Sequence, residues 1–482
     1  MHAIGRRLML MGGLCLGLCV SFGSWAQVTA QMPAPAEVAA TPAQQIAPVD
    51  MPAMAATVTA APAPAPAVLT RPGLVAQDSI NGADTAWMMT STALVLLMTL
   101  PGIALFYGGM VRKKSVINAM ACVVAIAALV SLLWFAVGYS IAFTPNNPWI
   151  GGSDRLWFHG LDYMKVANKL AVSHIAPNVP ESVYAMFQLT FAIITPALIV
   201  GAFVERMRFS AMFWFVALWS VFVYAPIAHW VWEPSGWLAS MGVLDFAGGS
   251  VVHINAGVSG LVCAYFLGPR LGYGREPFEP FNLGLTMAGA GLLWVGWFGF
   301  NAGSAVASDG RAGLAMAVTH IAAAAGAMTW MLGEWLIRRR PSLLGLCSGL
   351  VAGLVAITPA AGFVTPRSAL LIGAVAGLVC YWGATGLKRM LNADDSLDAF
   401  GVHGIGGIVG SLMTGLLASK TVSGVTSSFT TQLMGVAAVM LYSAVMSAVL
   451  LALIKVVIGL RVSEEAERNG LDISEHRERI GA

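Results

Sequence analysis

Two stretches of the sequence decide the fold, Asp245-Phe-Ala-Gly-Gly-Ser-Val-Val-His253 and Asp398-Ala-Phe-Gly-Val-His403. In each, a histidine follows an aspartate inside a glycine-rich apolar segment that has almost no other charge. Ionisable side chains are costly in hydrocarbon, so they mark functional sites there. Imidazole has an ordinary pKa of about 6.5 and exchanges protons near neutral pH. The pair therefore predicts a route for something polar or protonatable at membrane depth.

The composition predicts an all-α polytopic membrane protein. Hydrophobic residues make up 57% of the 482 residues and charged residues only 10%, with a mean hydropathy of +0.76. Soluble domains carry roughly 25% charged residues. Apolar windows recur that are long enough to cross a hydrocarbon core about 30 Å thick. Eleven such windows lie near residues 85–111, 116–143, 182–204, 209–232, 248–268, 281–305, 312–337, 343–360, 368–387, 400–419 and 433–460.

The first residues have the order of a cleaved signal peptide. Arg6 and Arg7 precede an apolar run over residues 8–23, which ends at Ser24-Trp25-Ala26. This order of charge, apolar run and small residues is typical of a signal peptide, here residues 1–26. A retained twelfth span is the alternative interpretation.

The rest of the chain divides into three parts. Residues 27–83 begin with a segment rich in alanine and proline that has no hydrophobic period, so we expect an extended external tail. A transmembrane domain is expected over residues 84–461. The polar residues 462–482 are expected to form a solvated cytoplasmic tail.

Basic residues predict the orientation. If the mature N-terminus lies outside, the inner loops contain every compact basic cluster, namely Arg112-Lys113-Lys114, Arg206 with Arg208, Arg270 with Arg275, Arg338-Arg339-Arg340 and Lys388-Arg389. The positive-inside rule then gives an N-out, C-in protein with an odd number of spans. The net charge of +3 reflects this topology, and no nucleic-acid partner is predicted.

The spans suggest a 5+5 inverted repeat followed by a final helix. Because each half has an odd number of crossings, the second half must be inserted upside down, which is typical of transporters. His253 lies eight residues past Asp245, roughly 12 Å along a helix, and His403 approaches from the opposite side. We expect the two imidazoles to meet near the midplane and to share a proton.

Simpler interpretations apply to several polar residues. His229 and His320 are interpreted as packing or hydrogen-bonding groups. Asp245 and Asp398 are expected to act mainly as helix N-caps, with an electrostatic effect on a pore as a secondary role. No metal site or cofactor is predicted, because no cysteine or carboxylate stands at ligand spacing from the histidines.

Four segments closely resemble the signatures of the Amt/Mep/Rh ammonium transporters, particularly bacterial Amt proteins. They are residues 101–110, 245–255, 296–304 and 398–404, and the likeness extends in order over about residues 84–476. The resemblance implies an eleven-helix homotrimer in the cell inner membrane that takes up ammonium as a nitrogen source, with one pore per protomer surrounded by lipid.

The resemblance also implies roles for individual residues. Phe191, Trp232 and Ser304 are implied to form an outer recruitment site, with Phe187 beside it. Phe191 and Phe300 are implied to form a gate. His253 and His403 are implied to line the pore as a twin-histidine pair, and Asp245 to stabilise the site from behind. Aromatic faces attract a small cation, and a hydroxyl accepts one of its N–H bonds. Aromatic side chains are also common in membrane packing, which is the alternative for Phe187 and Phe300.

The implied mechanism is recruitment of NH4+, deprotonation near the gate and conduction of neutral NH3, with the proton relayed by the histidine pair. The C-terminal region is implied to contact a cytoplasmic PII-type signalling protein. Two other functions stay open: a passive NH3 or CO2 channel of the Rhesus type, and an ammonium sensor or transceptor. An enzyme is not favoured.

Overall fold

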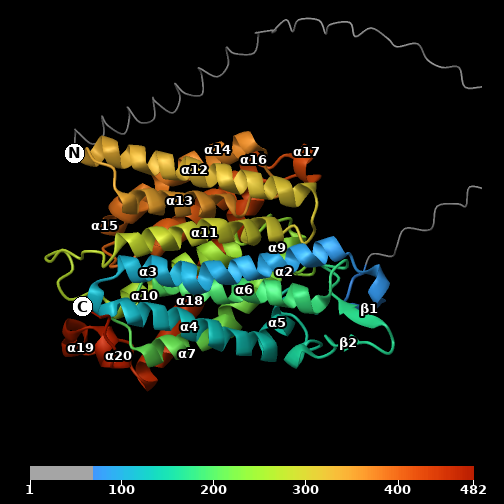
Figure 1. Cartoon of the computed structure of the whole chain (residues 1–482), viewed down its shortest axis with the longest axis horizontal. Coiled ribbons are helices and arrows are strands. Elements are labelled where there is room, and N and C mark those ends of the chain that lie inside the picture. Colours follow the sequence, from blue (N-terminus) through green and yellow to red (C-terminus); the bar gives the residue numbers. More distant parts are fainter. Residues whose placement is uncertain (1–68, 482) are drawn as a thin grey trace, which may run out of the picture. The chain divides into compact units, whose positions relative to one another are not determined.

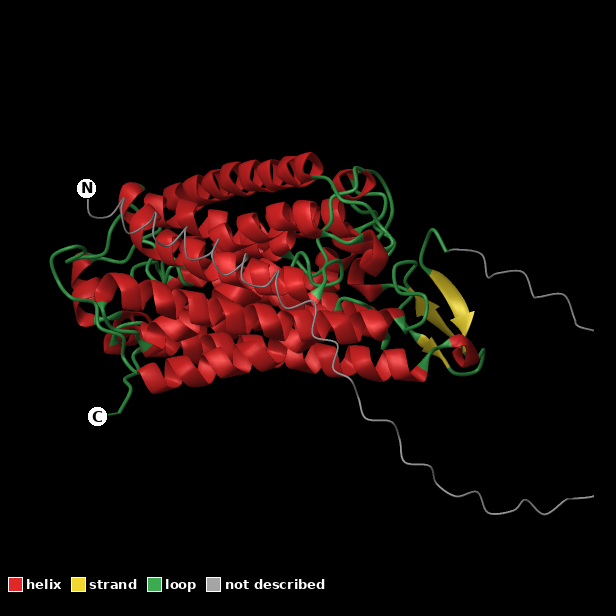
Figure 2. Cartoon of the chain, turned by 90° about the horizontal axis from the view of Figure 1, so that it is seen from above, coloured by secondary structure: helices red, strands yellow, loops and turns green. Residues whose placement is uncertain are grey.

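The computed structural model describes residues 69–481. The predicted signal peptide, residues 1–26, and the predicted external tail as far as residue 68 lie outside the described residues. The described part consists of helices that run side by side, with a small sheet at one end of the bundle (Figures 1 and 2). The last two helices of the chain lie at the opposite end from the sheet (Figure 1).

Ten helical segments within residues 69–481 are long and apolar enough to cross a membrane. Several of them join α-helical and π-helical turns without a break. The first five are Gly82–Met110 (α2 Gly82–Leu97, η3 Met98–Ile103, α3 Ala104–Met110), Lys113–Phe143 (η4 Lys113–Ser115, α4 Val116–Leu133, η5 Trp134–Gly138, α5 Tyr139–Phe143), Glu181–Val200 (α6), Phe209–Ser240 (α7 Phe209–Trp219, η7 Ser220–Tyr224, α8 Ala225–Trp232, α9 Trp237–Ser240) and Gly249–Leu267 (η8 Gly249–Ile254, α10 Asn255–Leu267). The other five are Leu283–Gly303 (α11), Gly310–Arg338 (α12), Pro366–Met390 (α14 Pro366–Trp382, η9 Gly383–Leu387, α15 Lys388–Met390), Phe400–Leu417 (η10 Phe400–Gly404, α16 Ile405–Leu417) and Phe429–Val457 (α18).

These segments coincide with ten of the eleven predicted windows. The remaining window, residues 343–360, contains the shorter apolar helix α13, Leu343–Ile357. Its 15 residues rise only about 22 Å, less than the roughly 30 Å of a hydrocarbon core. α13 packs against both α12 and α14, which also pack against each other, so it belongs to the same bundle.

Polar caps fix where several spans begin. The side chains of Asn81, Asn282 and Asp309 each accept hydrogen bonds from two backbone N–H groups in the first turns of α2, α11 and α12. These donors have no partner within their own helix, so the caps stabilise the helix ends. Each cap thereby sets the point at which an apolar stretch enters the bundle.

A small sheet joins the segment before the first span to the loop between α5 and α6. The strands β1 (Gly73–Ala76), β2 (Tyr163–Met164) and β3 (Lys169–Val172) are antiparallel in the order β1-β3-β2, with Gly73 opposite Val172. The turn η2 (Gln77–Ser79) follows β1, and α2 begins at Gly82. Residues 69–83, the described end of the predicted external tail, therefore contain a strand, a turn and the first residues of α2. Two further short turns, η6 (Leu156–Phe158) and α17 (Lys420–Ser423), lie in loops.

The C-terminal segment is docked, so the prediction of a solvated tail over residues 462–482 is wrong for its helical part. α19 (Glu464–Asn469) and α20 (Leu471–His476) lie near the ends of α4 and α7 (Figure 1). The backbone N–H of Asn118 donates to Asp472 Oδ1 at 2.8 Å, and Lys114 Nζ donates to the Glu467 carbonyl at 2.7 Å. These partners come from α4 and the turn before it, more than 350 residues away in sequence.

Candidate functional site

A cavity of about 90 Å³ brings together three of the predicted recruitment residues. Phe191 of α6, Trp232 at the end of α8 and Ser304 at the end of α11 all line it. The Phe191 and Trp232 rings meet edge to face with centroids 5.6 Å apart. Ser304 Oγ donates to the Phe300 carbonyl at 2.8 Å, which leaves its lone pairs to accept from a ligand in the cavity. Phe187 is fully buried behind Phe191, at a ring distance of 5.0 Å, and does not line the cavity.

Sequence reasoning missed several lining residues. Tyr184, Gln188 and Phe246 complete the wall of the cavity. Gln188 Nε2 donates to the Tyr184 hydroxyl at 3.3 Å, while Gln188 Oε1 is buried without a hydrogen-bond partner. An amide oxygen without a partner is an acceptor available to a ligand. The signal for Gln188 was its position on α6 one turn before Phe191, on the same helix face.

A buried pair is formed by the sequence neighbours of two lining residues. Glu233, the residue after Trp232, accepts from or shares a proton with His174 Nε2 at 2.9 Å, and His174 precedes the lining residue Ile175. The backbone N–H of Ser235 donates to the other oxygen of Glu233 at 2.6 Å. The carboxylate is therefore held in place next to the aromatic wall.

Two stacked phenylalanines close the inner side of the cavity. The rings of Phe191 and Phe300 lie 4.2 Å apart at an interplanar angle of 26°. Both side chains are buried, with exposed fractions of 1% and 0%. His253 follows at a ring distance of 6.1 Å from Phe300. A continuous series of rings thus leads from Trp232 through the two phenylalanines to a histidine.

The structure brings the two predicted histidines into contact. His253 Nδ1 and His403 Nδ1 are 3.3 Å apart, and the rings are nearly parallel at 17°. At this distance one Nδ1 donates a proton that the other accepts. The His253 ring also stacks on Trp297 at 5.4 Å, and its Nε2 is buried without a hydrogen-bond partner. That nitrogen is free to exchange a proton with a small ligand beside it.

Both histidines lie in π-helical turns, η8 and η10, which start the segments that contain α10 and α16. Single π turns are common at functional sites because they re-aim side chains within a helix. α10 packs against η10, and α16 packs reciprocally against η8. This exchange of contacts is what a two-fold pseudo-symmetry produces.

Glycines make the reciprocal contact possible. A Cβ placed on Gly257 would lie 2.3 Å from the backbone nitrogen of Gly404, and one on Gly407 would lie 3.0 Å from the backbone nitrogen of Ile254. Gly257 and Gly407 each follow their histidine by four residues, whereas Gly404 and Ile254 each follow it by one. The two helices therefore cross backbone to backbone, at equivalent positions of the two segments.

Asp245 caps η8, the direct role predicted for it. Its two carboxylate oxygens accept from the backbone N–H groups of Gly248, Gly249, Ser250 and Val251 at 2.6–3.1 Å. Burial raises the pKa of the Asp245 carboxyl, and these four hydrogen bonds act in the opposite direction. The Asp245 carbonyl also accepts from Trp232 Nε1 at 2.9 Å, which connects the cap to the cavity wall.

The cap expected of Asp398 is made by Asp395 instead. Asp395 accepts from the backbone N–H groups of Ala399 and Phe400, whereas Asp398 forms an ion pair with Lys388 Nζ at 2.8 Å. Asp395 precedes His403 by eight residues, the spacing that separates Asp245 from His253. This shared spacing was the sequence signal, and the interpretation of Asp398 as the cap was wrong.

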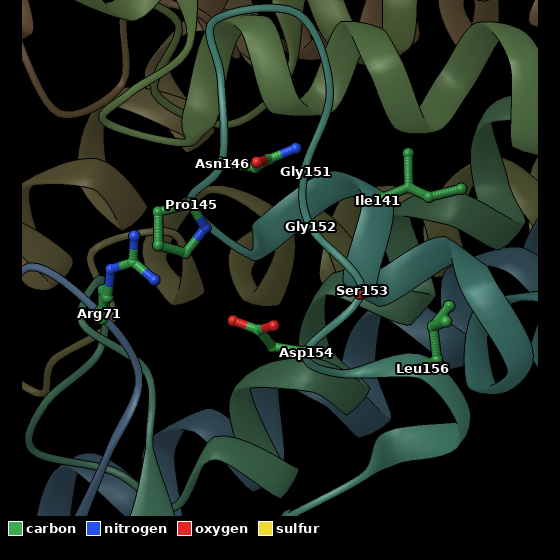
Figure 3. A pocket seen from close by; sticks show the side chains of 9 residues that line it. All are labelled: Arg71, Ile141, Pro145, Asn146, Gly151, Gly152, Ser153, Asp154 and Leu156. Carbon is green, nitrogen blue, oxygen red and sulfur yellow. The ribbon is translucent and has the colours of Figure 1, made fainter.

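The other two histidines differ from the pair. Each ring nitrogen of His229 lies within hydrogen-bonding distance of a backbone carbonyl, of Ala142 or of Asn147. His320 stacks on Trp294 at 5.0 Å. A separate hollow of about 470 Å³, with the side chains of Arg71 and Asp154 on its wall, contains none of the predicted site residues (Figure 3).

Known proteins resemble this chain over most of its length. The sequence profile of the Ammonium Transporter Family matches residues 86–480. An ammonium transporter of Bacillus subtilis is 45% identical over 405 residues, covering 82% of this chain and 98% of the relative. An ammonium transporter of Aquifex aeolicus is 47% identical over 412 residues, covering 84% and 94%.

Solved structures agree with the sequence relatives. The crystal structure of Candida albicans Mep2 matches with a TM-score of 0.74 and 35% identity, over 81% of this chain and 88% of that one. A structure described as a sensor Amt protein matches with a TM-score of 0.75 and 28% identity, over 82% and 98%. With a family profile that spans its helices and its ring-lined site, the chain is a multi-pass membrane protein that belongs to the ammonium transporter family.

Proposed function

We propose that the protein is an ammonium transporter that binds NH4+ at the outer cavity, removes a proton and conducts NH3 past the histidine pair. The observation that carries the proposal is the series of rings from Trp232 through Phe191 and Phe300 to His253, which ends on an imidazole nitrogen without a partner. Family membership supplies the substrate.

The cavity suits a small cation that carries hydrogen-bond donors. The faces and edges of Phe191 and Trp232 surround it, and aromatic rings attract cations by their negative faces. Ser304 Oγ and Gln188 Oε1 supply acceptors for N–H groups. Potassium has no directed hydrogen to donate, so the acceptors favour ammonium. The carboxylate of Glu233 behind the wall adds a favourable potential for any cation.

The stacked phenylalanines favour conduction of the neutral species. Moving an intact cation between two buried apolar rings costs several kcal/mol or more. Loss of one proton removes most of this penalty, because NH3 is neutral and small. We infer that NH4+ dissociates into NH3 and H+ beside the gate, that NH3 passes His253, and that the proton moves along the Nδ1–Nδ1 contact to His403. NH4+ forms again when both reach the inner side.

The membrane arrangement proposed for this function has eleven spans, with α13 as the short one, and an N-out, C-in orientation in the cell inner membrane. The two segments with matching spacing from aspartate to histidine support the inverted repeat. Resemblance to bacterial Amt proteins supports a homotrimer and a PII-type partner at the cytoplasmic face. Exposed apolar side chains such as Leu132, Leu441 and Val456 are suited to lipid.

Current recording on proteoliposomes tests the mechanism. An ammonium gradient should produce an inward current that potassium does not, and the current should follow NH4+ when pH is varied at constant NH3. His253→Ala and His403→Ala should each abolish the current or change its selectivity while the protein stays folded, because each removes one half of the proton path. Wild-type current in both variants would exclude the relay.

The same recording distinguishes the alternatives. A passive gas channel alkalinises the liposome interior without any current, because only the neutral species crosses. A sensor is supported by the similarity to a sensor Amt protein and by the docked C-terminal helices. Saturable ammonium binding with neither current nor alkalinisation would favour the sensor.

A further inference from the structure

A second cavity, of about 640 Å³, lies where the C-terminal helices dock. Four segments distant in sequence form its wall: the residues around η4, the loop after α10, the loop after α15, and α19. Its charged lining is mostly basic. It comprises the cations Arg112, Lys114, Arg270, Arg275 and Arg468, and the carboxylates Glu276 and Glu467.

Two of the five cations already have carboxylate partners. Arg270 forms ion pairs with Asp394 and with Glu205, and Arg112 Nε lies 2.9 Å from the other oxygen of Glu205. Both carboxylates lie behind the cavity wall rather than on it. Within residues 69–481, Lys114, Arg275 and Arg468 have no carboxylate within salt-bridge distance.

The negative charge of the lining is also largely compensated. Glu467 pairs with Arg461 at 2.7 Å and accepts from the backbone N–H of Leu271 at 2.7 Å. Glu276 is then the one lining carboxylate, within the described part of the chain, that no ion pair neutralises. The cavity therefore has an excess of positive charge.

The two paired arginines are held in place by an aromatic ring. The guanidinium groups of Arg112 and Arg270 both lie over the Phe278 ring, each with Cζ 4.4 Å from the ring centroid. The positive-inside rule accounts for basic residues in these loops, but not for their convergence on one cavity.

The shape and chemistry fit an oxyanion. Guanidinium groups bind phosphate oxygens through two parallel hydrogen bonds, and a lysine ammonium adds a point charge. The volume falls within the range of small-molecule sites. We propose that this cavity binds a phosphate-bearing anion, which bridges the first inner loop and the C-terminal segment and holds the two together. The site is separate from the ammonium pathway and does not depend on transport.

Equilibrium binding to the purified full-length protein, without ammonium, tests this site. The soluble probes are inorganic phosphate and pyrophosphate, and the lipid probe is short-chain phosphatidylglycerol compared with phosphatidylcholine, all at matched ionic strength. The test variant is Arg275→Gln with Arg468→Gln, both exposed, so that no buried ion pair is broken. The control is Lys113→Gln with Arg389→Gln, which removes two exposed basic residues from the same end of the bundle but outside the cavity.

Saturable binding of one probe class that weakens by about tenfold or more in the test variant, and not in the control, supports the proposal. Binding of phosphate or pyrophosphate identifies a soluble ligand, and preference for phosphatidylglycerol over phosphatidylcholine identifies a lipid head group. No saturable binding of either class, or equal weakening in the test and control variants, overturns it.

Discussion

Gly257→Ala is the most direct test of how the pore pair is held. The new Cβ would lie 2.3 Å from the Gly404 backbone nitrogen, whereas ordinary van der Waals contact begins near 3.4 Å. The obstructing atom is backbone, so no side chain can rotate away, and α10 must move from η10 by about 1 Å. Because His403 precedes Gly404, this movement widens the 3.3 Å contact between the histidines. Overpacking of this kind costs about 1–3 kcal/mol.

Ammonium current in proteoliposomes and the melting temperature in detergent measure the two effects of Gly257→Ala. A displacement of about 1 Å in a reacting constellation lowers its rate by about a hundredfold, so current should fall much more than stability explains. Gly291→Ala on α11 is the matched control, because a Cβ there meets nothing within 4 Å. Wild-type current and melting temperature in Gly257→Ala would refute the close backbone crossing.

Three further outcomes follow from the site. Trp232→Leu should weaken discrimination for ammonium over potassium and larger cations, because the cation-π wall is lost; unchanged competition by potassium and methylammonium would count against the recruitment site. Asp395→Ala should lower the melting temperature and the current more than Asp398→Ala, because only Asp395 accepts hydrogen bonds from the first N–H groups of η10. Such a cap contributes about 1 kcal/mol. Equal effects of the two substitutions would contradict the assignment of the cap to Asp395. Burial raises the pKa of Asp395 from 3.8 to about 6, so folding favours its protonated form. The resulting stabilisation of the fold is complete below about pH 4 and is lost as pH rises through 6, by up to about 3 kcal/mol. The melting temperature should therefore fall in this pH range, and Asp395→Asn should remove that fall. A fall of the same size in the variant would exclude Asp395 as its source.

The spans were predictable because burial in hydrocarbon leaves a strong, local signature. A window of about 20 apolar residues can be recognised in the sequence without knowing its tertiary partners. Ten of the eleven windows coincide with long apolar helices. The meeting of His253 and His403 was also predictable, since an internal repeat places equivalent residues near one axis. The family resemblance implied a recruitment site at Phe191, Trp232 and Ser304. Composition and periodicity alone do not distinguish these residues from packing residues.

The remaining features depend on tertiary partners. Three aspartates, Asp394, Asp395 and Asp398, stand within five residues, and only the fold decides that the first pairs with Arg270, the second caps a helix and the third pairs with Lys388. The docking of α19 and α20 likewise relies on groups more than 350 residues away, so their sequence alone looked like a solvated tail. Strands of two to four residues are too short for an alternation of apolar and polar residues to predict them.

The docked C-terminal helices also fix the order in which the protein can be completed. The backbone N–H of Asn118 finds its acceptor in Asp472, 354 residues later. At synthesis rates of about 5–20 residues per second, the ribosome needs roughly 20–70 s to produce that acceptor. During this interval the backbone N–H of Asn118 at the start of α4 lacks the acceptor that it has in the folded protein. The end of the bundle at which α19 and α20 dock is therefore finished last, and a chain that stops before α19 leaves the start of α4 without this acceptor.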